Sequence, residues 1–109
     1  MKTDPETLKS LALALPEAET KPHFDRLSFR VGNKIFATLA EADGEAVVKL
    51  TLADQSALVG SDPETFFLPG WSHQGWTGIR LDRIAPSTLQ DLLRQAWRNV
   101  APKSLVEKP

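Results

Sequence analysis

The most telling run of this sequence reads Arg26-Leu27-Ser28-Phe29-Arg30-Val31-Gly32-Asn33-Lys34-Ile35-Phe36-Ala37-Thr38-Leu39. In its first half every second residue is apolar, and the residues between them are the polar Arg26, Ser28 and Arg30. This period of two is typical of a β-strand with one buried face. Gly32-Asn33 is a two-residue turn signal, after which Lys34 to Leu39 returns as a second strand. The run therefore predicts a β-hairpin with one apolar face and one cationic face.

Two further segments extend this hairpin into an antiparallel sheet. A turn at Ala42-Asp43-Gly44 leads to a third strand from Ala46 to Leu50, and Trp76 to Leu81 alternates like a last strand. The alternation predicts which side chains face the helices: Leu27, Phe29, Ile35, Val48, Leu50, Ile79 and Leu81. Ile35 competes with Phe36 for the inward side, and a bulge after the turn would exchange the two.

Helical patterns precede and interrupt the strands. Thr3 is a candidate N-cap, Glu6 completes a capping box, and Pro16 ends the first helix. Glu17 to Pro22 then reads as a polar connection, and Leu52 to Gly60 as a short helix. We expect these helices to lie on one face of the sheet.

The strongest helix pattern lies near the end of the chain, between Pro86 and Pro102. Its apolar positions form one stripe: Leu89, Leu92, Leu93, Ala96, Trp97 and Val100. Before it, Ser61 opens a second helical turn that leads to Phe66-Phe67-Leu68. Together the patterns predict an α+β domain, an antiparallel sheet with the N- and C-terminal helices packed on one face.

Composition limits the classes of protein to consider. A chain of 109 residues has the length of a single domain, residues 1–109, which we expect to be a monomer. The sequence has no cysteine, which excludes disulfides and thiolate chemistry, and no apolar run long enough to span a membrane. The N-terminus lacks the pattern of a signal peptide, so we expect a cytoplasmic location. The net charge of −1 means that nucleic-acid binding would need a local basic patch.

Four cations fall on the polar face of the predicted sheet: Arg26, Arg30, Lys49 and Arg80. Arginine and lysine supply most phosphate contacts in nucleic-acid complexes, so this face is the candidate nucleic-acid surface. The alternative is a solvated strand face on which the cations pair with acidic residues across strands.

A second candidate site surrounds the segment from Pro69 to Leu81, which is rich in tryptophan and glycine. Trp76 could stack a base or serve as a core anchor, whereas we expect Trp71 to anchor its loop to the domain. His23 and His73 could line a ligand groove beside Trp76. Neither histidine belongs to a metal-binding or catalytic spacing, so we expect no catalytic residue, metal or cofactor.

Short motifs follow one another in a characteristic order: Leu13-Ala14-Leu15-Pro16-Glu17-Ala18, Pro22-His23-Phe24, Ser28-Phe29-Arg30-Val31, Lys34-Ile35-Phe36-Ala37, Val48-Lys49-Leu50, Pro69-Gly70-Trp71, Gly75-Trp76, Ala96-Trp97 and Ala101-Pro102-Lys103. In order and spacing, from about Leu11 to Leu105, they resemble the MmcQ/YjbR family. The resemblance implies a frataxin-like (CyaY-like) fold and DNA binding through a double-wing arrangement. Frataxins are thought to use an acidic ridge for iron, but here lysines interrupt the acidic residues of that region.

These observations predict a non-enzymatic binding domain whose leading ligand is DNA. Binding would be weak and would use the phosphate backbone, since the chain carries few clustered cations. The alternative is a module that binds a protein partner or a small ligand in the groove between the tryptophan segment and the sheet.

Overall fold

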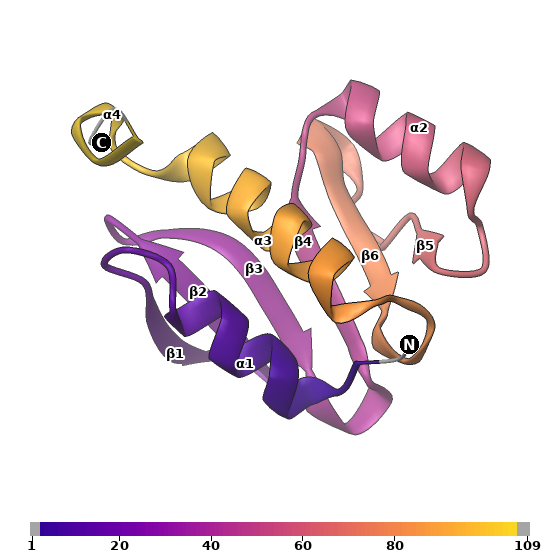
Figure 1. The fold of residues 1–109 in the computed structure, drawn as a ribbon, viewed down its shortest axis with the longest axis horizontal. Coiled ribbons are helices and arrows are strands. Elements are labelled where there is room, and N and C mark those ends of the chain that lie inside the picture. Colours follow the sequence, from indigo (N-terminus) through magenta and orange to yellow (C-terminus); the bar gives the residue numbers. More distant parts are fainter. Residues whose placement is uncertain (1–2, 107–109) are drawn as a thin grey trace.

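The computed structural model describes residues 3–106 of the chain. Within that range the strands form one antiparallel sheet in the order β1-β2-β3-β4-β6-β5 (Figure 1). The strands are β1 (Glu19–His23), β2 (Arg26–Val31), β3 (Lys34–Ala40), β4 (Glu45–Lys49), β5 (Phe66–Phe67) and β6 (Trp76–Arg80). The α-helices are α1 (Pro5–Leu13), α2 (Leu52–Ser61), α3 (Pro86–Val100) and α4 (Lys103–Val106). The predicted α+β architecture is confirmed.

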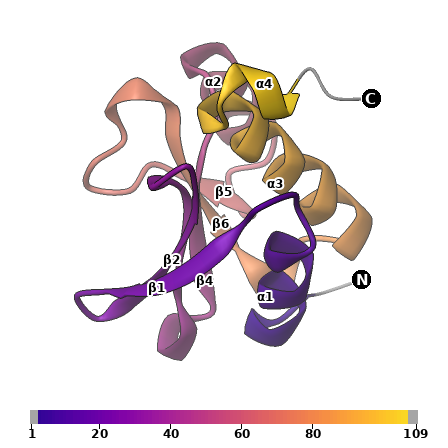
Figure 2. The same cartoon turned by 90° about the vertical axis from the view of Figure 1, so that its left-hand side faces the viewer.

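Helices α1 and α3 cover one face of the sheet, and the core lies between the two layers (Figure 2). The apolar stripe of α3 is buried as predicted, and Trp97 is only 5% exposed. Its indole Nε1 donates a hydrogen bond of 2.9 Å to the carbonyl oxygen of Pro16, which ties the connection between α1 and β1 to α3. We call the opposite sheet face the outer face.

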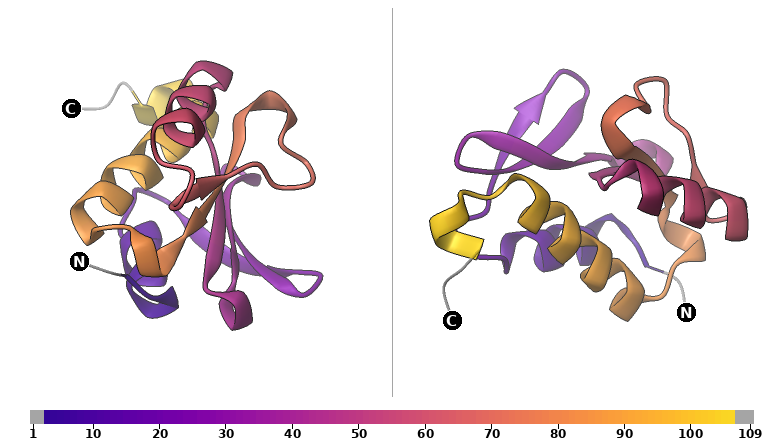
Figure 3. Two further views of the ribbon diagram at one scale, coloured as in Figure 1. Left: turned by 90° about the vertical axis from the view of Figure 1, so that its right-hand side faces the viewer. Right: turned by 90° about the horizontal axis from the view of Figure 1, so that it is seen from above.

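Helix α2 lies apart from the other helices, beside β5 and β6 (Figure 3). It connects β4 to β5, and residues 68–75, the tryptophan loop, then lead into β6. This loop projects on the outer side of the sheet, away from α1 and α3 (Figure 2). No helix within residues 3–106 is both long and apolar enough to span a membrane.

The β2–β3 hairpin confirms the predicted turn and decides the question of Ile35. Gly32 and Asn33 have φ angles of 59° and 66°, the positive values that a type I′ turn requires. The register shifts near this turn: Phe29 pairs with Ala37, whereas Arg30, the next residue, pairs with Ile35. The bulge turns Phe36 into the core and leaves Ile35 half-buried on the outer face, so the inward prediction for Ile35 is wrong.

Two strands were missed. The predicted connection at Glu17 to Pro22 is wrong from Glu19 onward, since β1 pairs with β2 along its whole length. Pro22 is tolerated there because β1 is an edge strand and needs hydrogen bonds on one side only. The helical turn predicted from Ser61 is present but begins at Asp62, whose carbonyl oxygen accepts from the amides of Thr65 and Phe66, because Ser61 still belongs to α2. The strand β5 that follows it, Phe66–Phe67, was not predicted.

The first helix begins one residue later than predicted. Asp4 is the N-cap, and its Oδ1 accepts a hydrogen bond of 2.8 Å from the backbone amide of Thr7. This bond holds the pKa of the Asp4 carboxyl below its ordinary value. Thr3, predicted as the cap, instead donates from its hydroxyl to the carbonyl oxygen of Leu81 at 2.7 Å.

Candidate functional site

The outer face carries all four predicted nucleic-acid contacts. A row of cross-strand neighbours runs through its middle: Ser28, Thr38, Val47 and Gly78. The cations lie two residues from a member of that row along their own strands: Arg26, Arg30, Lys49 and Arg80. Since alternate residues of a strand share a face, the four side chains leave the sheet on the same side.

Arg26 and Arg30 lie over hydroxyl groups of the sheet. The Arg26 Nε donates to Thr38 Oγ1 at 3.2 Å, and the Arg30 Nε donates to Ser28 Oγ at 3.0 Å. Among the described residues, the terminal amino groups of both guanidiniums have no hydrogen-bond partner. Each fork is therefore oriented by its Nε and still has donors available for an anion.

Lys49 and Arg80 make different contacts. The Lys49 ammonium donates to the carbonyl oxygen of Gln74 and lies 5.8 Å from the centre of the Trp76 ring. The Arg80 guanidinium lies 4.7 Å from the Phe67 ring, and its Nη1 donates to two carbonyl oxygens of the α2–β5 connection. Arg80 thus holds that connection and lies outside the cavity described next.

The cross-strand charge pairs of the alternative explanation are missing from the part of the chain that the structure describes. Within residues 3–106 none of the four outer-face cations contacts a carboxylate, whereas Lys9 and Arg83 do. Glu45 pairs in register with Arg80 without forming an ion pair with it. The positive charge of the outer face is therefore not neutralised by direct contacts.

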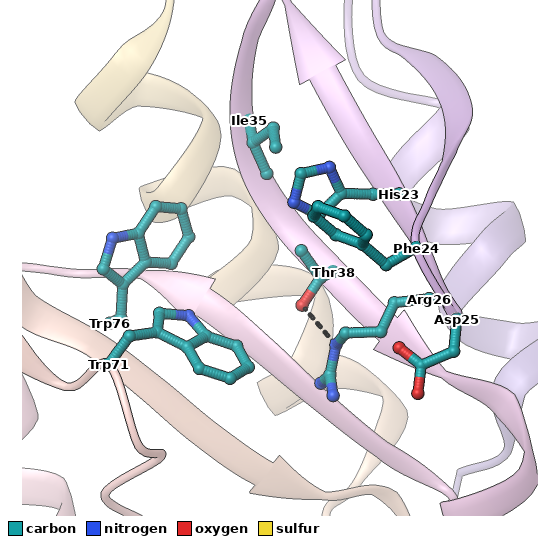
Figure 4. Close-up of a pocket in the computed structure, with 8 residues that line it drawn as sticks. All are labelled: His23, Phe24, Asp25, Arg26, Ile35, Thr38, Trp71 and Trp76. Atoms are coloured by element: carbon teal, nitrogen blue, oxygen red, sulfur yellow. Dashed lines mark hydrogen bonds between the residues drawn. The ribbon is translucent and has the colours of Figure 1, made fainter.

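A cavity of about 660 Å³ opens on the outer face, with the β1–β2 turn on one side and the tryptophan loop on the other (Figure 4). We call it the aromatic groove, and its lining residues are His23, Phe24, Asp25, Arg26, Ile35, Thr38, Trp71 and Trp76. Figure 4 shows the two indole rings on one side and Phe24 with His23 on the other. The Arg26 guanidinium carbon lies 5.2 Å from the centre of the Trp71 ring.

Both tryptophans of this region line the groove. Trp71, predicted to anchor its loop, is 40% exposed and lines the groove. Trp76 also lines the groove but is half-buried, at the start of β6. The prediction of a buried anchor is therefore wrong for Trp71, and the groove has two accessible indole surfaces.

His23 and His73 do not lie together. His23 lines the groove as predicted, and its ring meets that of Phe24 edge to face with 4.9 Å between centroids. His73 is exposed in the short 3₁₀ helix His73–Gly75 and is not among the lining residues. Within residues 3–106 no three His, Cys, Asp or Glu side chains gather in a way that could hold a metal ion.

Gln55 positions the tryptophan loop and was missed from the sequence. It is buried on α2, and its Nε2 donates to the carbonyl oxygens of Ser72 at 2.8 Å and Trp76 at 2.7 Å. Gly75 adds a second attachment, since its carbonyl accepts from the Leu50 amide at 3.1 Å. A buried glutamine in a weakly amphipathic helix has no sequence signal that distinguishes it from an exposed one.

The comparisons agree with this fold. The model of the YjbR family matches residues 13–99. The chain belongs to the YjbR family. A crystal structure of Deinococcus radiodurans protein DR2400, with a DUF419 domain, is similar to it with a TM-score of 0.81 and 21% sequence identity. The similarity covers 95% of this chain and 82% of DR2400. No curated protein matches the chain, so this YjbR domain takes no function from a named relative.

Proposed function

We propose that this YjbR domain is a non-catalytic nucleic-acid-binding module that contacts phosphates through its outer face. The observation that carries the proposal is the set of four cations on one sheet face, none of which contacts a carboxylate among the described residues. Arg26 and Arg30 contribute most, because their terminal donors are unoccupied. Arginine forks match phosphate oxygens in geometry and charge.

The charge balance limits the affinity that such a surface can reach. The chain has a net charge of −1, and Asp25 lies among the residues that line the groove. Counterion release supplies most non-specific binding and grows with the number of phosphates neutralised. A surface with three or four such contacts should bind weakly and lose affinity steeply with salt.

The double substitution Arg30→Ala/Lys49→Ala tests this function. Titration of a labelled duplex at low salt should show lower affinity by a similar factor for every sequence, because phosphate contacts do not read bases. The matched control is Arg94→Ala/Arg98→Ala, which removes two exposed cations of α3 on the opposite side of the molecule. Failure of the intact domain to bind any nucleic acid at tens of micromolar would overturn the proposal.

The aromatic groove supports a second candidate, a module for a small ligand or a protein partner. Its volume of about 660 Å³ falls within the range of roughly 300–1,000 Å³ that ligand sites occupy. In that case Trp76→Ala should abolish binding of the ligand, and nucleic acid should not compete with it. A thermal-shift screen of small aromatic anions, followed by competition with an oligonucleotide, separates the two candidates.

We also propose that the domain shares the frataxin-like (CyaY-like) topology implied by its resemblance to MmcQ/YjbR proteins. The antiparallel sheet with N- and C-terminal helices on one face supports this. Superposition on a frataxin structure with the same strand order tests it.

A further inference from the structure

The aromatic groove has features that phosphate binding alone does not require. We propose that it seats an unpaired nucleobase, so that the domain prefers single-stranded nucleic acid to duplex. The inference rests on the proposed function and specifies which nucleic acid the outer face binds.

Aromatic rings approach the groove from separate elements. Trp71 comes from the tryptophan loop, Trp76 from the start of β6, and Phe24 from the β1–β2 turn (Figure 4). Ile35 and Thr38 of β3 also line the cavity. A planar base needs such apolar ring surfaces on its faces, and base–aromatic stacking tolerates any of the bases.

Phe24 is placed where folding alone would not put it. Its side chain is 93% exposed, and its φ of 60° lies in the left-handed region that bulky residues avoid. In a two-residue hairpin turn whose first residue alone has a positive φ, that position favours Gly. A ring kept there contributes almost nothing to the core and is free to contact a ligand in the groove.

The cations lie beside the rings rather than apart from them. The Arg26 guanidinium carbon is 5.2 Å from the Trp71 ring centre, and the Lys49 ammonium is 5.8 Å from that of Trp76. Arg30 lies further along β2 on the same face. Apolar ring faces next to unneutralised cations are complementary to a nucleotide unit, which joins a flat base to an anionic phosphate. They disfavour an ammonium ligand, which the cations would repel.

A base within a duplex cannot use this groove. Its faces are covered by neighbouring base pairs, and flipping it out costs a few kcal/mol. A single strand offers the same base without that cost, while its phosphates still reach Arg26 and Arg30. The preference for single strands therefore follows from the position of the groove's rings beside the cations of the outer face.

Fluorescence anisotropy with three probes tests the inference. The probes are a labelled thymidine single strand of about ten nucleotides, the corresponding duplex, and free thymidine monophosphate as an unlabelled competitor. The variants are Trp71→Ala and Phe24→Asn, and thermal unfolding of each checks that it folds. Leu52→Ala on α2, 61% exposed and outside the groove, is the matched control for loss of an exposed apolar side chain.

The intact domain should bind the single strand at least about fivefold more tightly than the duplex, the lower limit expected for one stacked base. Each groove variant should lose affinity for the single strand by a similar factor and should keep most of its affinity for the duplex. Leu52→Ala should bind both as tightly as the intact domain. Equal affinities for both forms, with Trp71→Ala harmless, would overturn the inference and leave phosphate binding intact. Free nucleotide competing as strongly as the strand would overturn it in favour of a mononucleotide ligand. No binding of either nucleic acid would overturn the proposed function as well.

Discussion

Phe24 combines an unfavourable backbone conformation with an exposed ring, and substitution measures what this combination costs the stability of the domain. A bulky side chain at a positive φ costs about 1–2 kcal/mol, and Asn tolerates such a φ better than Phe does. Phe24→Asn should therefore raise the free energy of unfolding by up to about 1 kcal/mol. Chemical denaturation measures the change. A loss of stability would mean that the phenyl ring packs against the domain in a way that its 93% exposure does not suggest.

Gly75 and Gly60 form a contrasting pair of glycines. A Cβ at Gly75 would overlap the Leu50 carbonyl oxygen, and its φ of 91° suits only glycine, whereas a Cβ at Gly60 meets nothing. Gly75→Ala should cost about 3 kcal/mol or more. Gly60→Ala in α2 should stabilise by up to about 1 kcal/mol. Urea denaturation of both variants tests this, and equal effects would contradict the described geometry of the tryptophan loop.

Some residues of the groove can be predicted from the sequence and others cannot. Arg26 follows from strand alternation, and His23 and Trp76 from their position beside the sheet. Trp71 was misjudged because its glycine-rich surroundings suit a packed corner as well as an exposed loop. Phe24 carries no periodic signal, and its exposure depends on a turn that the sequence did not reveal.

The tryptophan loop depends on α2 for its position, and Gln55 is the main link. Gln55→Ala leaves the carbonyls of Ser72 and Trp76 without their donor. It should cost about 1–3 kcal/mol and increase quenching of tryptophan emission by iodide, since the loop loosens. The control is Gln95→Ala, an exposed glutamine on α3. Unchanged stability and quenching in Gln55→Ala would show that other contacts hold the loop.

Elements with a clear pattern of apolar residues were predicted from the sequence. Strands that depend on pairing with a neighbouring strand were not. Strands β2 and β6 alternate, β3 and β4 are short apolar runs bounded by turn residues, and the stripe of α3 has a clear helical period. Strand β1 is polar, contains Pro22 and is exposed along most of its length, so only its pairing with β2 makes it a strand. Strand β5 has two residues, too few for any period. The bulge that exchanges Ile35 and Phe36 is likewise a property of paired strands.

The molecule has two chemically different sides, and the salt dependence of nucleic-acid binding should show which of them contacts phosphates. Helices α1 and α3 close one side of the sheet, while the outer face combines cations with aromatic rings. For a single strand, Arg26→Ala/Arg30→Ala should reduce the slope of log affinity against log salt by about one to two units. Arg94→Ala/Arg98→Ala should leave the slope unchanged. Anisotropy titrations over a salt series provide both values, and equal slopes would place the phosphate contacts elsewhere.

The most direct measurement is an NMR titration of the ¹⁵N-labelled domain with a short single strand, which locates the binding surface without any substitution. We expect shifts to concentrate in β2, the β1–β2 turn, the start of β6 and the tryptophan loop, with the Trp71 and Trp76 indole signals among the largest. The indole of Trp97 donates to Pro16 on the other side of the sheet, and its NMR signal should not shift. Shifts confined to α1 and α3, or none at saturating oligonucleotide, would contradict nucleic-acid binding on the outer face.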